Sequence, residues 1–191
     1  MRYSKKEIFT IPNFLSTFRI LLIPVYAILY MKAQVLKDYI IAAAVFAASA
    51  LTDMVDGIIA RKFNMRSRIG IMLDPFADKL TQGVVILCLT LRNPAILPLL
   101  ILFILKEGFM LVMACRLLHG GKMLDGALIS GKICTTVLFV SMAALVVFKN
   151  IPLGGIYAIV GICAVFMLIS LVSYAKIFFT ASEHIRDIDE Q

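Results

Sequence analysis

The chain has 191 residues, of which 61% are hydrophobic and 16% are charged, and its mean hydropathy is +0.96. A soluble domain carries roughly 25% charged residues, so this composition excludes an ordinary soluble protein and indicates an integral membrane protein. The formal net charge of +7 does not indicate a nucleic-acid partner, because no basic stripe with interleaved aromatic residues appears on a soluble face.

Six apolar stretches follow one another, and each is long enough for a helix that crosses a bilayer, which takes about 20 residues. We therefore expect an all-α integral membrane protein with six transmembrane helices. The first stretch is too long for a signal peptide and lacks a convincing cleavage site, so we expect it to be retained. Little remains for a soluble domain, and residues 1–191 are interpreted as one membrane domain. The predicted helices cover residues 12–33, 38–62, 69–91, 94–116, 127–148 and 153–178.

The basic residues of the loops predict the orientation in the membrane. Cytoplasmic loops of membrane proteins carry an excess of Lys and Arg, and six helices divide the loop residues into two sets. One set holds eleven basic residues and the other holds only Lys32, Lys37, Arg92 and Lys149. The richer side, which includes both termini, is expected to be cytoplasmic. We expect a multi-pass protein of the plasma membrane, in a bacterial setting.

Four aspartates interrupt the apolar sequence of the second and third helices. Asp53 and Asp56 are three residues apart, and Asp74 and Asp78 are four apart, so each pair lies on one helix face. A short basic loop joins the two helices, which predicts antiparallel neighbours. At 1.5 Å per residue, Asp56 and Asp74 reach one depth and Asp53 and Asp78 another. The four carboxylates are therefore expected to converge near the cytoplasmic surface.

Four converging carboxylates need cations, because like charges at close range raise pKa values and cost free energy. Oxygen ligands suit hard ions such as magnesium or manganese, and four negative charges balance two divalent cations. Internal salt bridges to residues such as Arg61 or Lys79 are the structural alternative. A divalent-cation transporter is a functional alternative, and a metal-binding structural protein is another. The apolar outer halves of both helices favour a pocket open to one side, and hence an enzyme.

Small residues surround the acidic pairs. Gly57, Ala60 and Gly70 lie within a turn of Asp56 or Asp74, and their size lets a ligand approach the helix backbone. Arg61 ends the second helix, where a guanidinium can grip a diphosphate. Helix packing and a cytoplasmic loop charge are the alternative explanations for these residues. Two metals with a phosphate site are a recurring arrangement for displacement at phosphorus.

The spacing D-x-x-D-G-x-x-A-R-x₈-G-x-x-x-D-x-x-x-D, from Asp53 to Asp78, resembles the signature of the CDP-alcohol phosphotransferase family. This resemblance implies a homodimeric six-helix membrane enzyme that binds two divalent cations, magnesium or manganese. It implies that Asp53, Asp56 and Asp74 are metal ligands and that Asp78 is both a ligand and the catalytic base. The residues implied to line the CDP-lipid site are Gly57, Ala60, Arg61 and Gly70.

Two further segments, at residues 11–26 and 73–80, resemble the phosphatidylglycerophosphate synthases. Those enzymes transfer a phosphatidyl group from CDP-diacylglycerol to glycerol 3-phosphate and release CMP, which is the activity this resemblance implies here. By the same match, Arg116 and Lys132 are the expected acceptor-binding residues. Cys134 stands where that subfamily usually has a second basic residue. The cardiolipin synthases, whose acceptor is phosphatidylglycerol, therefore remain the alternative.

Overall fold

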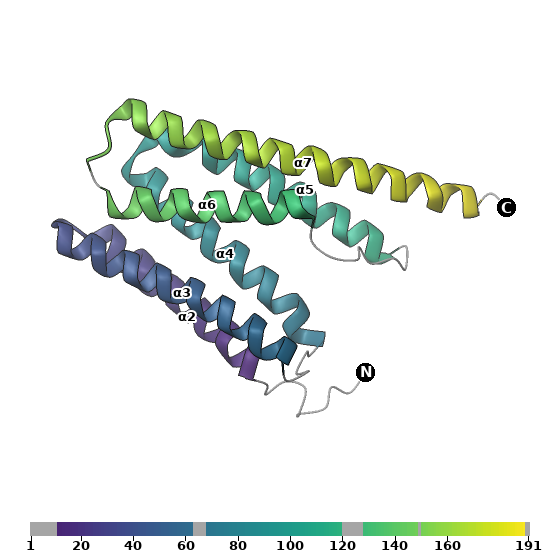
Figure 1. The fold of residues 1–191 in the computed structure, drawn as a ribbon, viewed down its shortest axis with the longest axis horizontal. Coiled ribbons are helices and arrows are strands. Elements are labelled where there is room, and N and C mark those ends of the chain that lie inside the picture. Colours follow the sequence, from purple (N-terminus) through teal and green to yellow (C-terminus); the bar gives the residue numbers. More distant parts are fainter. Residues whose placement is uncertain (1–10, 63–67, 120–127, 149, 190–191) are drawn as a thin grey trace. The chain divides into compact units, whose positions relative to one another are not determined.

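A computed structural model describes residues 11–62, 68–119, 128–148 and 150–189. Within these helices, the side chains of residues 11–13, 53–54, 56–62, 68–75, 117–119 and 179–189 lie outside the description. The described chain is all-α, as predicted (Figure 1). Its elements are α2 (Ile11–Lys32), α3 (Leu36–Lys62), α4 (Arg68–Arg92), the 3-10 helix η1 (Pro94–Ile96), α5 (Leu97–His119), α6 (Ile129–Val147) and α7 (Leu153–Asp189).

The six predicted helices correspond to α2 through α7, and most ends agree to within three residues. Two differences have local causes. Asn93-Pro94 ends α4, because proline disfavours helical geometry in the residue before it, and the chain forms η1 before α5 begins. At the other end, α7 continues to Asp189, beyond the predicted helix end at residue 178. The sequence from Leu171 to Asp189 contains no Gly or Pro and nothing interrupts the helix.

Four segments of the described chain are long and apolar enough to span a membrane: Phe14–Lys32, Pro94–Arg116, Ile129–Val147 and Leu153–Phe178. The prediction of six spans is therefore supported for four helices. The side chains of α3 and α4 are described only in part, so the spans expected there stay predictions. The cytoplasmic location of the termini stays a prediction.

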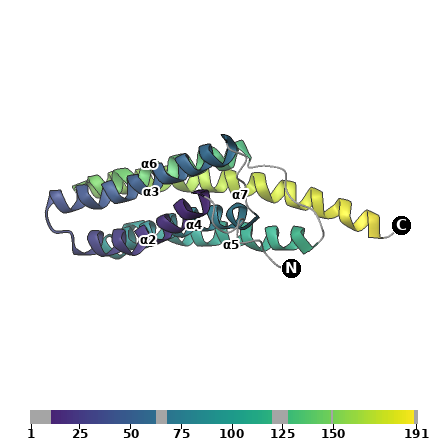
Figure 2. The same cartoon turned by 90° about the horizontal axis from the view of Figure 1, so that it is seen from below.

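The contacts divide the chain into two compact units, residues 1–93 with 142–151 and residues 94–141 with 152–191. The interpretation of the chain as one domain stays a prediction. In the first unit α2 packs against both α3 and α4. Figure 2 shows α2 and α3 as a hairpin closed by a short turn. The buried face of α2 repeats at intervals of three and four residues, the spacing of one helix face: Ser16, Arg19, Ile23, Tyr26 and Tyr30.

Arg92, the last residue of α4, contacts the end of α2 and the start of α3. Its Nη2 donates hydrogen bonds to the carbonyl oxygens of Met31 (2.8 Å) and Ala33 (2.7 Å), and its Nη1 donates to the Tyr39 hydroxyl. Its guanidinium also lies over the rings of Tyr30 and Tyr39, at 5.4 and 5.3 Å. The C-terminal end of α4 therefore meets that of α2, so these two helices run parallel. Since α2 and α3 form a hairpin, α3 and α4 run antiparallel, as predicted.

We expect Arg92→Ala to lower the midpoint of thermal unfolding in detergent by several degrees. The substitution removes charge-assisted hydrogen bonds and two cation–π contacts, which together are worth about 1–3 kcal/mol at a partly solvated site. Arg92→Lys keeps the charge but loses the planar fork, so its midpoint should fall between those of the wild type and the alanine variant. An alanine variant as stable as the wild type would contradict this role.

In the second unit α7 packs along α5 and against η1. Buried apolar side chains of these two helices include Leu99 and Phe103 of α5 and Cys163 and Met167 of α7. One ion pair is buried with them. Lys106 Nζ lies 2.6 Å from Glu107 Oε1, and Lys106 is 5% exposed. The charge of Lys106 is therefore balanced within α5.

Candidate functional site

The backbone places the predicted site residues on two helices of the first unit. Asp53, Asp56, Gly57, Ala60 and Arg61 belong to the last three turns of α3, and Gly70, Asp74 and Asp78 belong to the first three turns of α4. Asp78 is the member of this set whose side chain the structure describes. The side chains of the other seven lie outside the described part, so their convergence stays a prediction.

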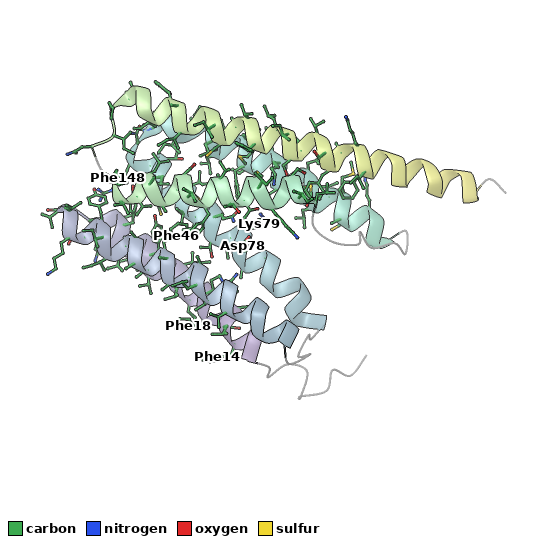
Figure 3. All side chains as sticks on the ribbon, viewed as in Figure 1. Phe14, Phe18, Phe46, Asp78, Lys79 and Phe148 are labelled. Carbon is green, nitrogen blue, oxygen red and sulfur yellow. The ribbon has the colours of Figure 1, made fainter. Side chains whose placement is uncertain are left out.

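Asp78 lies on α4, where Figure 3 labels it together with Lys79, and it contacts two polar neighbours. Its side chain is 32% exposed, so it is partly desolvated yet open to a ligand. Gln82 Nε2 donates to both carboxylate oxygens of Asp78, at 3.3 Å each. Lys79 Nζ lies 3.8 Å from Asp78 Oδ2. An ionised carboxylate held by a fixed donor can accept a proton from a substrate at its open side.

Gln82 is a site residue that the sequence analysis missed. It is 2% exposed, and both ends of its amide are engaged, because Oε1 accepts from Lys79 Nζ at 3.4 Å while Nε2 donates to Asp78. This arrangement fixes the amide and, through it, the rotamer of Asp78. The signal was present in the sequence, since Gln82 stands four residues after Asp78, the spacing of neighbours on a helix surface.

The chemistry of the donor set fits divalent cations of the hard class. Four aspartates supply oxygen ligands only, which magnesium and manganese prefer. No group of three or more potential ligand side chains occurs within the described residues, a set that includes only Asp78 of the four aspartates. Asp78 meets the requirement for a ligand in being partly exposed.

The predicted acceptor-binding residues belong to the second unit. Arg116 lies near the end of α5 and Lys132 in the first turn of α6, and both side chains are exposed. The start of α6 is held by α7, because the Leu128 N–H donates to the Tyr174 hydroxyl oxygen at 3.2 Å. A Cβ at Gly131 would lie 2.7 Å from that oxygen, so glycine permits this close contact. Lys132 therefore projects from a rigidly positioned helix end.

Cys134, at the position where a second basic residue was expected, is buried at 3% exposure in the core of the second unit. A basic side chain here would need a buried partner. An acceptor site at the start of α6 would therefore use the charge of Lys132, and position 134 would supply none.

Comparison with known proteins decides the family. Residues 9–178 match the CDP-alcohol phosphatidyltransferase family. The chain belongs to that family. The match includes the whole of α3 and α4 and both acidic pairs, so the resemblance inferred from the aspartate spacing is confirmed. The chain is accordingly a multi-pass membrane protein.

Curated relatives in this family fall into two groups. The chain is 42% identical over 104 residues to a Schizosaccharomyces pombe protein named cardiolipin synthase (CMP-forming) / mitochondrial hydrolase fusion protein, covering 54% of the chain and 17% of that protein. It is 41% identical over 99 residues to human cardiolipin synthase (CMP-forming), covering 51% of the chain and 32% of the human protein. It is 35% identical over 82 residues to an Escherichia coli CDP-diacylglycerol–glycerol-3-phosphate 3-phosphatidyltransferase, covering 43% of the chain and 44% of that enzyme. In each case the match spans less than half of the relative.

Proposed function

We propose that this CDP-alcohol phosphatidyltransferase transfers the phosphatidyl group of CDP-diacylglycerol to a hydroxyl of glycerol 3-phosphate and releases CMP. The observation that carries the proposal is the family match across both acidic pairs, together with the partly exposed carboxylate of Asp78 held by Gln82. The proposal treats residues 1–191 as one functional domain that forms a homodimer in a bacterial plasma membrane, with its site facing the cytoplasm.

In the proposed reaction the acceptor oxygen attacks the lipid-side phosphorus of CDP-diacylglycerol. A P–O bond forms to the acceptor, the P–O bond to CMP breaks, and CMP leaves with the bonding electrons. Asp78 takes the proton of the attacking hydroxyl, while Gln82 keeps the carboxylate in place. Two divalent cations, magnesium or manganese, held by Asp53, Asp56, Asp74 and Asp78, would neutralise phosphate charge. Gly57, Ala60, Gly70 and Arg61 are proposed to bind the CDP portion.

Cardiolipin synthesis is the second candidate, with phosphatidylglycerol as the acceptor. Two observations favour it: the identity of 41–42% to proteins named as cardiolipin synthases and the cysteine at position 134. Supplying purified protein with CDP-diacylglycerol and either acceptor, and separating the lipid products by thin-layer chromatography, decides between the two. Phosphatidylglycerophosphate supports the first proposal, whereas cardiolipin formed only from phosphatidylglycerol supports the second. CMP release also separates an enzyme from a cation transporter, which would instead move metal ions into liposomes.

We expect Arg116→Ala to raise KM for glycerol 3-phosphate about tenfold, because a hydrogen bond to a charged group is worth about 1.5–3 kcal/mol. Lys132→Ala should act in the same direction, and KM for CDP-diacylglycerol should change little in both variants. Steady-state kinetics with glycerol 3-phosphate varied provide the measurement. Lys176→Ala removes another exposed cation of the second unit and serves as the matched control. If neither site variant differs from this control, the acceptor assignment is wrong.

A further inference from the structure

A charged side chain lies in the core of the first unit. Arg19 of α2 is 1% exposed and is among the largest fully buried side chains of the described chain. Burying a guanidinium is costly unless it is paired and hydrogen-bonded, and Arg19 does take part in a hydrogen bond, an ion pair, a ring contact or another electrostatic interaction. The counter-charge of Arg19 is expected on α3 or α4, because these helices pack on α2.

The register of the three helices shows which residues lie level with Arg19. A small cavity marks one layer of the core, and its lining includes Tyr26 of α2, Phe46 of α3 and Val85 of α4. The rings of Tyr26 and Phe46 are 6.0 Å apart. Seven residues make almost two complete turns of a helix, a rise of roughly 10 Å on the same face. Arg19 lies two turns from this layer, toward the start of α2.

The same step of seven residues leads to two aspartates. Since α3 runs antiparallel to α2, seven residues beyond Phe46 is Asp53. Since α4 runs parallel to α2, seven residues before Val85 is Asp78. On α3, Asp53 continues the helix face of Tyr39, Ala42, Phe46 and Ser49, all of which are buried. Arg19 therefore shares one layer of the helix bundle with Asp53 and Asp78, at the deep level of the proposed metal site.

We propose that Arg19 is a positioning residue that pairs with Asp53 and holds the acidic cluster in its metal-binding arrangement. This inference rests on the proposed function, because it assumes that the aspartates bind divalent cations. The guanidinium supplies a fixed positive charge from a third helix, which offsets carboxylate repulsion before the metal binds. Its planar fork of donors also orients a carboxylate better than a lysine ammonium does. Arg19 touches no reacting atom in this proposal and acts through the aspartate it holds.

Thermal unfolding in detergent, measured in EDTA and again with excess Mn²⁺, tests the proposal without an activity assay. Arg19 and the metal neutralise the same carboxylates, so the loss of Arg19 should matter most when the metal is absent. We expect Arg19→Gln to lower the unfolding midpoint by about 10 °C in EDTA and by less than half as much in Mn²⁺. Arg19→Lys keeps the charge and should retain most of the stability in EDTA.

Arg92→Gln is the matched control. It removes another cation of the first unit, but at the opposite end of α4, where its partners are Tyr39 and backbone carbonyls. Its midpoint should fall equally in EDTA and in Mn²⁺. If Arg19→Gln also loses the same stability under both conditions, Arg19 is an ordinary structural residue and the proposal is overturned.

A charge-pair variant covers the case in which Arg19→Gln does not fold. The double variant Arg19→Gln/Asp53→Asn leaves neither charge buried without its partner, so it should be more stable in EDTA than Arg19→Gln alone. A double variant that is no more stable than the single one overturns the pairing with Asp53. If Mn²⁺ does not change the unfolding midpoint of the wild type, the metal site of the proposed function is overturned instead. The double variant then still decides whether Arg19 pairs with Asp53.

Discussion

Asp78→Asn is expected to lower kcat for CMP release by on the order of 100-fold or more, which is the usual contribution of a general base. The amide keeps the shape of the side chain but cannot take the proton of the acceptor hydroxyl. KM for CDP-diacylglycerol should change much less, because the substitution acts mainly on the chemical step. The measurement is CMP release by purified protein at saturating concentrations of both substrates.

Asp38→Asn provides the matched control for this variant. It is the same chemical change in the same unit, at an exposed carboxylate in the first turn of α3 that accepts hydrogen bonds from the Gln34 and Val35 N–H groups. Its kcat should remain close to that of the wild type. Near-normal kcat in Asp78→Asn would remove Asp78 from the mechanism. A similar drop in both variants would indicate a general loss of folded protein.

Removal of divalent cations is expected to abolish CMP release, because the proposed cluster of four carboxylates would bind a CDP-lipid diphosphate only after its charge is neutralised. Activity in excess EDTA should fall to background and return when Mg²⁺ or Mn²⁺ is added. Asn substitutions at Asp53, Asp56 or Asp74 should raise the metal concentration needed for half-maximal activity. Circular dichroism should show that helix content is unchanged in these variants. Full turnover in EDTA would rule out the proposed metal dependence.

The helices were predictable because their signals are local. Runs of apolar residues mark the four segments long and apolar enough to span a membrane, and Asn93-Pro94 marks the end of α4. The extension of α7 to Asp189 was missed because hydropathy reports on the membrane and not on helix formation. The polar sequence after residue 181 continues the helix without an apolar run. For α3 and α4, whose side chains the structure describes only in part, the membrane span stays a prediction.

The candidate site was predictable in part. The spacing of Asp53, Asp56, Asp74 and Asp78 pointed to one face on each of two helices, and the family match confirmed the resemblance drawn from it. Gln82 was missed although its spacing from Asp78 is local, because a glutamine within an apolar helix has many possible partners. Only the structure shows that both ends of its amide are engaged. The acceptor was not predictable from the helix pattern. Residues that would distinguish glycerol 3-phosphate from phosphatidylglycerol bind a ligand and do not shape a helix.

The sequence by itself determined the class of protein, the approximate helices and the family, because composition, hydropathy and a spaced motif are properties of neighbouring residues. Only the tertiary structure decided which helices meet. The packing of α2 against both α3 and α4 depends on the sum of many side-chain contacts between residues far apart in the chain, such as the rings of Tyr26 and Phe46. The same packing buries Arg19. Its position in an apolar segment was visible in the sequence, but its level beside Asp53 and Asp78 follows from the register between helices, which no local pattern encodes.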